Sequence, residues 1–230
     1  MSPARLGWSF SWVILVAGVS APLASTADGN SQEASAPEHL LARVQQRYRE
    51  ASDLRARFTQ RTTPRPGGLT SVAEGSWFSR PPGLIRIEYA STGRLFVADG
   101  EALYWYLPRD NQVQVLAQSA LDPSQTPLLY LAGAGNLKLD FRVSRANWRE
   151  TLRPGNVQLR LDPVRQGARF SHLLLEIELD KAAVVRLAWS GLLGELTELR
   201  FRDVEFDVGL SGEAFRFVLP TDARVERLRD

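Results

Sequence analysis

The spacing of apolar residues changes once along this chain, from a helical period to a period of two. Between residues 38 and 48 the apolar side chains recur at helical spacing, which predicts an amphipathic helix with one apolar stripe. These side chains are Leu40, Leu41, Val44 and Tyr48. From residue 54 onward apolar and polar residues alternate, as in a strand with one buried face. The pattern therefore predicts one helix followed by β structure.

Alternating segments continue through most of the remaining chain, with turn residues roughly every 8–12 positions. Among them, 84–89, 102–107, 137–143 and 214–219 are predicted strands. The dipeptide Asp99-Gly100 lies between two apolar runs and is a strong hairpin signal. Residues 120–135 interrupt the series, and the segment from Thr126 predicts a short inserted helix. We expect about ten or eleven strands and two helical pieces in one domain.

An antiparallel sheet with this many strands curls and hides most of its edges. The helical pieces must bury their apolar stripes against another element, and the concave face of a curled sheet offers one. We therefore expect a mainly β fold: an incomplete, half-open antiparallel β-barrel with α-helical lids over an apolar cavity. A plain β-sandwich is the alternative that the same pattern allows.

The first residues have the organisation of a secretory signal peptide. Arg5 supplies a positive charge, residues 8–19 are almost all apolar, and the small side chains of Ser25-Thr26-Ala27 precede Asp28. An apolar run of about a dozen residues is too short to span a bilayer comfortably, so we expect this leader to be cleaved.

Cleavage divides the chain into three expected parts. These are a signal peptide over 1–27, a flexible tether over 28–37 and a folded domain over 38–230. The chain has no cysteine, so it has neither a disulfide nor the lipid-bearing thiol that a bacterial lipoprotein needs after its signal. We expect a secreted, soluble protein that is stabilised by its core.

The charge of the chain argues against one large class of partner. The net charge is +2, and loss of Arg5 with the leader lowers it to +1. A nucleic-acid-binding domain needs a concentrated basic excess, so we expect no nucleic-acid partner.

No constellation of residues in the sequence points to catalysis. His39 and His172 have no metal-ligand spacing between them, and both are expected to be solvated. The sequence contains no cysteine nucleophile, Gly-x-Ser-x-Gly elbow or phosphate-binding glycine loop. Glu176, Glu178 and Asp180 alternate along a predicted strand and are expected on a solvated outer face. We expect no enzymatic activity, no cofactor and no metal, which leaves binding.

One predicted strand has bulky residues on both faces. The run Leu103-Tyr104-Trp105-Tyr106-Leu107 can bury only one face in the core. The other face is expected to meet a lid, a ligand or a partner.

Several short motifs follow one another in a recognisable order. They are Phe58-Thr59-Gln60, Gly75-Ser76-Trp77-Phe78, an Arg-Pro segment before Arg86-Ile87-Glu88-Tyr89, Val97-Ala98-Asp99-Gly100 with Leu103-Tyr104-Trp105-Tyr106, Thr126-Pro127-Leu128-Leu129, and Phe215-Arg216-Phe217-Val218-Leu219-Pro220 with Val225. With the predicted leader and first helix, this order resembles the LolA family of periplasmic lipoprotein carriers. The likeness covers nearly all of the expected mature chain.

The resemblance implies what such a chain does. LolA-like carriers are half-open barrels without enzymatic activity, and they shield the acyl chains of lipoproteins in an apolar cavity. They receive this cargo from an inner-membrane ABC transporter and hand it to an outer-membrane receptor. By this resemblance we expect a monomer in the periplasm with acylated lipoproteins as its cargo.

The resemblance and the strand pattern together name candidate site residues. The expected cavity lining is Phe58, Ile85, Ile87, Tyr89, Leu103 and Trp105. The expected lid residues are Leu40, Leu41, Val44, Leu128 and Leu129. A strand register that is wrong by one residue would turn several of these outward.

The resemblance also assigns a role to Arg80. In the family, the arginine of the Arg-Pro segment holds the lid closed by hydrogen bonds, and Arg80 takes that place here. This chain departs from the pattern because it has two prolines, Pro81-Pro82. Counted back from Glu88-Tyr89, Pro81 occupies the arginine's position. Either the loop absorbs the extra residue and Arg80 is the latch, or the latch differs.

Other classes of function stay possible from the sequence. The same fold could carry another acyl lipid or a glycolipid, or could act as a lipid-sensing or interaction domain of the envelope. An outer-membrane receptor of this shape should have a lipidated cysteine, which the sequence lacks.

Overall fold

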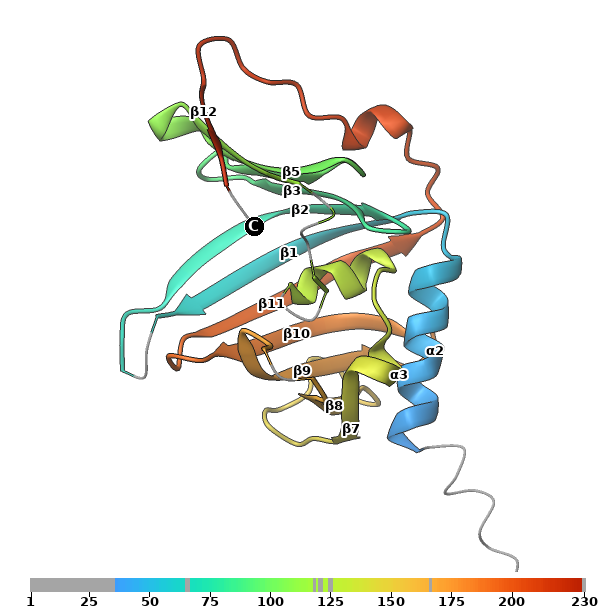
Figure 1. The fold of residues 1–230 in the computed structure, drawn as a ribbon. Helices are drawn as coiled ribbons and strands as arrows, with labels where there is room; N and C mark the ends of the chain where they lie inside the picture. Colours follow the sequence, from blue (N-terminus) through green and yellow to red (C-terminus); the bar gives the residue numbers. More distant parts are fainter. Residues whose placement is uncertain are drawn as a thin grey trace, which may run out of the picture.

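A single curved sheet dominates the structure (Figure 1), a computed structural model that describes residues 36–64, 67–117, 119, 122–123, 126–165 and 167–228. The sheet has 12 strands in the order β12-β6-β5-β4-β3-β2-β1-β11-β10-β9-β8-β7. Neighbouring strands are antiparallel, except that β12 runs parallel to β6. Strands β12 and β7 are the two edges, so the sheet does not close. This confirms the mainly β, half-open architecture.

The strands follow the predicted alternation closely. The first half consists of β1 (Leu54–Thr63), β2 (Ser71–Arg80), β3 (Leu84–Tyr89), β4 (Leu95–Ala98), β5 (Ala102–Leu107) and β6 (Gln112–Ala117). The second half consists of β7 (Phe141–Arg145), β8 (Val157–Pro163), β9 (Phe170–Glu178), β10 (Ala183–Gly191) and β11 (Leu196–Phe206), and β12 (Arg224–Arg227) returns to the first half. The predicted strands over 84–89 and 102–107 have the observed bounds.

The helical elements are α2 (Pro37–Glu50), η3 (Pro127–Ala132) and α3 (Leu137–Asp140), with short 3-10 turns η1 (Pro108–Asp110) and η4 (Gly212–Phe215). Figure 1 shows α2 along one end of the sheet and η3 in front of β10 and β11. The first helix begins at Pro37, one residue earlier than predicted, because proline needs no hydrogen-bond partner at the first helical position. The inserted helix is a 3-10 helix from Pro127.

Two predicted strands are wrong. Residues 137–140 form α3, because the Asn136 side chain caps this turn by accepting the N–H of Leu139, and only Phe141–Arg145 is a strand. Residues 214–219 do not join the sheet either. Phe217 stacks on the Tyr104 ring on the outer face of β5, with ring centroids 4.5 Å apart. Burial against the outer face replaces strand pairing there.

The Asp99-Gly100 hairpin is confirmed between β4 and β5. Gly100 has a φ of 102°, which glycine adopts without strain. The Asp99 carboxylate accepts the N–H groups of Glu101 and Ala102 at 2.9 Å each.

The expected signal peptide (1–27) and most of the expected tether (28–35) lie outside the described residues. Within the described part of the chain, no helix is both long enough and apolar enough to cross a bilayer.

Candidate functional site

The predicted cavity residues lie together on the concave face of the first half of the sheet. Phe58, Ile85, Ile87 and Tyr89 are buried, and Leu103 and Trp105 are half-buried against the same cluster. Along β3, buried residues alternate with half-buried ones, as the period of two predicts.

Aromatic rings form a continuous wall on this face. Phe58 and Tyr89 meet edge-to-face with centroids 5.4 Å apart, and Tyr89 meets Trp105 at 6.0 Å. The wall requires Gly75, because a Cβ there would lie 2.0 Å from the Glu88 carbonyl oxygen and 2.8 Å from the Phe58 ring. This is the glycine of the Gly-x-Trp-Phe motif.

Few polar groups reach this wall. The Tyr89 hydroxyl donates to the Gln60 side-chain oxygen at 2.9 Å, and the Arg94 guanidinium lies 4.7 Å from the Tyr89 ring centroid. Burial raises the pKa of Tyr89, and the nearby Arg94 charge opposes that rise. Tyr89 is therefore neutral at physiological pH, and the wall stays apolar.

Helix α2 covers the second half of the sheet. Leu40, Leu41, Val44 and Tyr48 are all buried beneath it. The Tyr48 hydroxyl accepts the N–H of Val184 at 3.0 Å, at an irregularity in the pairing of β9 and β10. Burial raises the pKa of Tyr48. This predicted lid therefore has both an apolar stripe and a polar anchor.

The second predicted lid, η3, is also buried against the sheet. Leu129 is buried with the neighbouring Tyr130 and Leu131, and Leu128 is half-buried. Two hydrogen bonds tie the end of η3 to the sheet: the Ser79 hydroxyl donates to the Leu131 carbonyl at 3.2 Å, and the Gly83 N–H donates to the Ala132 carbonyl at 2.9 Å.

The end of η3 also depends on a glycine. Gly133 has a φ of 73°, and a Cβ there would lie 2.7 Å from the Tyr48 carbonyl oxygen and 3.0 Å from Pro81. Only a residue without a side chain lets α2, η3 and the loop after β2 approach this closely.

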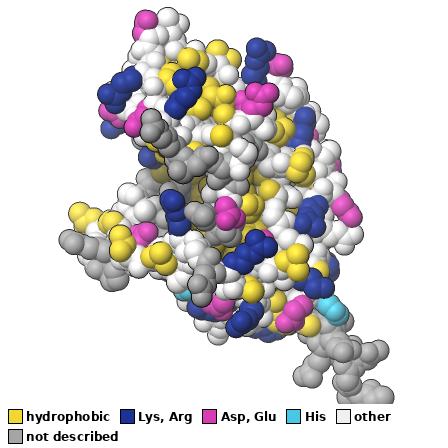
Figure 2. Space-filling model, viewed as in Figure 1, with side chains coloured by type: hydrophobic (Ala, Val, Ile, Leu, Met, Phe, Trp, Pro, Cys, Tyr) yellow, Lys and Arg dark blue, Asp and Glu magenta, His cyan; other side chains and the backbone are white. Residues whose placement is uncertain are grey.

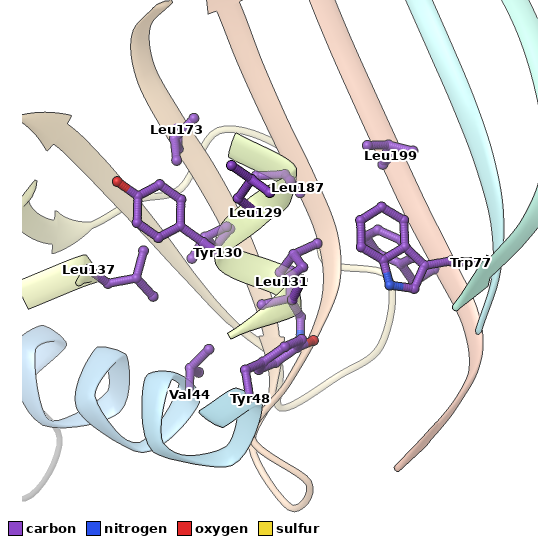
Figure 3. Close-up of a cluster of buried hydrophobic side chains, with 14 of the residues drawn as sticks. Val44, Tyr48, Trp77, Leu129, Tyr130, Leu131, Leu137, Leu173, Leu187 and Leu199 are labelled. Carbon is purple, nitrogen blue, oxygen red and sulfur yellow. The ribbon is translucent and has the colours of Figure 1, made fainter. Parts of the chain in front are cut away.

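Lid side chains fill the interior that they cover (Figure 3). The cluster joins Val44 and Tyr48 of α2, Leu129 and Leu131 of η3, and Trp77, Leu173, Leu187 and Leu199 of the sheet. Two cavities that remain beside it, one against α2 and one against Trp77, measure about 10 Å³ each. Such a cavity holds at most about one water molecule, so the space between the helices and the sheet is filled by side chains there.

The convex face of the second half contains an ion network that contradicts the prediction for Glu176. Its carboxylate is fully buried and lies 3.3 Å from the Arg186 guanidinium, which also approaches Glu198 at 3.8 Å. The loop after β7 covers it, and Asn156 donates to Glu176 at 2.7 Å. Glu176 is therefore covered rather than solvated, whereas Glu178 is half-buried and Asp180 is exposed as predicted.

Residues 49–218 match the family described as outer membrane lipoprotein carrier protein LolA. The match spans well over half of the 230 residues. The chain belongs to the LolA family. An outer-membrane lipoprotein carrier protein from Alkalilimnicola ehrlichii is 30% identical over 182 residues, covering 77% of this chain and 79% of that protein. One from Cupriavidus necator is 26% identical over 198 residues, covering 83% and 90%.

A solved structure supports the fold. An uncharacterized conserved protein from Thermus thermophilus superposes with a TM-score of 0.51 at 17% identity, covering 86% of this chain and 99% of that one. The open sheet with few helices is thus shared with a solved structure.

The Arg80 side chain of this LolA-family chain contacts the segment after β11 and Asp53. Its guanidinium donates to the Leu210 carbonyl oxygen, lies 4.0 Å from the Asp53 carboxylate, and sits 5.4 Å from the Phe215 ring centroid. These contacts hold the segment after β11. The hydrogen bonds onto η3 come from Ser79 and Gly83 instead, so a latch role for Arg80 stays a prediction.

Sequence reasoning missed Ser79 and the Tyr48 hydroxyl. Ser79 shares the inward face of β2 with Trp77, whose Nε1–H it accepts at 3.1 Å. A polar residue at an inward position of a strand is the signal that could have identified it. For Tyr48, the stripe of α2 predicted burial but not its hydroxyl's partner.

The outer face of β5 is covered by the chain itself. Phe217 on Tyr104 shows that a C-terminal segment meets the second bulky face of the run 103–107. The expectation was a lid, a ligand or a partner, and the contact observed is instead with a C-terminal segment of the same chain.

Proposed function

We propose that this chain is a periplasmic carrier that takes the acyl chains of a lipoprotein into its concave interior and carries them between the two membranes. Loading from an inner-membrane ABC transporter and delivery to an outer-membrane receptor belong to the proposal, and no step in it is catalytic. The observation that carries it is the interior: an apolar concave face that is filled by lid side chains rather than by the sheet itself.

Physical chemistry gives such a carrier its purpose. Each methylene of an acyl chain that leaves water contributes about 0.8 kcal/mol, so a chain of about 16 carbons represents roughly 12 kcal/mol. An acylated cargo therefore does not cross an aqueous compartment alone. A cavity lined by Phe58, Ile85, Ile87, Tyr89, Leu103 and Trp105 would replace the membrane during transit.

The lids set how tightly cargo is held. In the closed conformation Leu40, Leu41, Val44 and Leu129 bury their own apolar surface, with Leu128 half-buried beside them. Cargo must displace these side chains, and their lost burial subtracts from the net affinity. This competition keeps binding weak enough for a receptor to remove the cargo.

Hydrogen bonds at the end of η3 would act as the latch of this equilibrium. Ser79 and Gly83 hold the carbonyls of Leu131 and Ala132, and both bonds must break before η3 leaves the interior. Pro81, which occupies the family arginine's place in the shifted register, packs beside Gly133 at the same point. This favours the second alternative from the sequence, in which the latch differs.

The test is a release assay. The purified chain from Asp28 on is incubated with spheroplasts, and the supernatant is examined for a soluble one-to-one complex with a triacylated lipoprotein. Two neighbouring aromatics on opposite faces provide matched variants: Trp105→Ala on the concave face should lower the yield, and Tyr106→Ala on the convex face should not.

Two outcomes would contradict different parts of the proposal: the identity of the cargo and the place where it binds. If no lipoprotein is released and native mass spectrometry shows a bound free lipid, the chain carries another acyl lipid. If neither cargo binds, or if both variants behave alike, the concave interior is not the binding site.

A further inference from the structure

Three hairpin turns meet at one end of the sheet. Strand β1 pairs with both β2 and β11, so the β1–β2 turn lies beside the β10–β11 turn, with Thr63 opposite Leu196. The β8–β9 turn reaches the same end, because Phe170 at the start of β9 is opposite Gly191.

The first two turns and the adjoining start of β2 present large aliphatic side chains to solvent. Leu69 is 94% exposed, Leu193 88%, Leu192 69% and Val72 55%. We name these four residues the tip surface. In Figure 2 hydrophobic side chains gather on the projection at the left, where these turns lie in Figure 1. Leu69 and Leu193 are the most exposed large hydrophobic residues of the described chain.

The residue preferences of tight turns do not account for leucine at these positions. Gly194 N–H donates to the Gly191 carbonyl at 3.2 Å, so Leu192 and Leu193 are the two central residues of a tight turn. Such positions favour Gly, Pro, Asn, Asp or Ser, which suit the backbone and water. Two adjacent leucines there have no role in the fold's own core.

The turns also hold these side chains outward. The Glu195 carboxylate accepts the Leu193 N–H at 3.2 Å, and the Gly191 N–H donates to the Glu195 carbonyl at 2.8 Å. Across the other hairpin, the hydroxyls of Thr63 and Thr70 are 2.8 Å apart. These bonds fix the backbone of the turns from which the exposed leucines project.

Basic residues lie at the same end of the sheet as the tip surface. Arg61 is directly opposite Val72 on the neighbouring strand, and Arg165 and Arg169 lie in the β8–β9 turn. All three are exposed, and none forms an ion pair with another described residue. The acidic residue of the β10–β11 turn, Glu195, already accepts the Leu193 N–H.

We propose that the tip surface docks on a bilayer that contains anionic lipids. Leucines would enter the boundary between headgroups and acyl chains, and the three arginines would meet lipid phosphates. Narrow protruding turns fit a lipid surface better than a second copy of this chain, since a stable dimer buries about 800 Å² per partner. The cargo proposal is needed only to explain why docking is useful, because docking itself requires no cargo.

The experiment is vesicle flotation of the empty chain from Asp28 on. Vesicles of phosphatidylglycerol and vesicles of phosphatidylcholine are compared. We expect binding to phosphatidylglycerol vesicles, weaker binding to phosphatidylcholine, and about a tenfold loss for Leu192→Ser/Leu193→Ser, as for side chains that leave water only in part. Leu219→Ser is the matched control, because Leu219 is also exposed but lies in the C-terminal segment.

Each result decides the proposal. Failure of the unaltered chain to float with either vesicle overturns it, as does an equal loss for Leu219→Ser. If the double variant floats normally yet no longer delivers cargo to receptor-containing membranes, the tip surface docks on a protein instead. Release of cargo from spheroplasts by a chain that never floats would separate a failed docking proposal from a valid carrier.

Discussion

The Ser79 hydroxyl donates a 3.2 Å hydrogen bond to the carbonyl oxygen of Leu131 and so joins the concave face of β2 to the lid η3. Both residues are buried, and Ser79 also accepts the Trp77 indole N–H. One small polar side chain thus satisfies a strand aromatic and a lid carbonyl at once. Under the proposed mechanism, opening of η3 would break this bond and expose the carbonyl to water.

Replacing Ser79 with alanine should loosen the closed lid. Ser79→Ala leaves the Leu131 carbonyl and the Trp77 N–H without a partner, so the free energy of unfolding should fall by about 1–3 kcal/mol. Hydrogen exchange over 127–132 should accelerate, and a fluorescent acyl probe should bind faster. Ser76→Ala, on the outer face of the same strand, is the control. Unchanged exchange over 127–132 would show that Ser79 does not hold the lid.

Replacing Arg80 separates two roles for this residue. Its contacts with Leu210 and Phe215 predict that Arg80→Leu accelerates hydrogen exchange over 207–216 and leaves 127–132 unchanged. If Arg80 instead latches the lid, exchange over 127–132 should rise, and release of cargo should change more than loading. Unchanged transfer to the receptor would exclude the latch role.

Alkaline pH should destabilise the closed conformation through Tyr48. Burial raises its pKa above the ordinary value of 10.0, so the folded state holds the phenolic proton more tightly than the unfolded state does. The resulting stability is present below about pH 10 and is lost as the pH rises further. Urea unfolding at a series of pH values measures this slope.

Tyr48→Phe should make that alkaline slope shallower. It should also lower stability at neutral pH by about 1–3 kcal/mol, because the Val184 N–H loses its partner. A slope identical to that of the unaltered chain would assign the alkaline transition to other groups.

Removing the charge of Arg186 should lower the free energy of unfolding substantially. Arg186→Met leaves Glu176 and Glu198 buried without their cation, and breaking one partner of a buried pair costs about 3–5 kcal/mol. Arg160→Met is the matched control, since the Arg160–Asp162 pair is partly exposed and should contribute less than about 1 kcal/mol. An equal loss of stability in the two variants, measured by urea unfolding, would show that the buried network contributes no more than the exposed pair.

Most of the sheet was predictable because alternation is a local property. Ile85, Ile87 and Tyr89 share a face by their spacing alone, and the structure buries all three. The same rule placed Phe58 with them. Wherever one face of a strand packs and the other does not, the sequence carries the pattern.

The failures occurred where a second layer covers the sheet. Glu176 has the spacing of a solvated face, yet the loop after β7 folds over it and supplies its donors. Residues 214–219 have a strand pattern, yet Phe217 packs on Tyr104 from outside. The alternation of apolar and polar residues along a strand cannot show whether its polar face meets water or another part of the chain.

The sequence by itself determined the half-open β architecture, the apolar stripe of the first helix and the membership of a carrier family. It did so because residue spacing and motif order are written along the chain. Only the tertiary structure decided that Ser79 and Gly83 hydrogen-bond to η3, that Arg80 meets the C-terminal segment, and that the leucines of two distant turns gather at one end. These relationships join residues far apart in sequence, and their geometry exists only after the sheet has curled and the lids have packed.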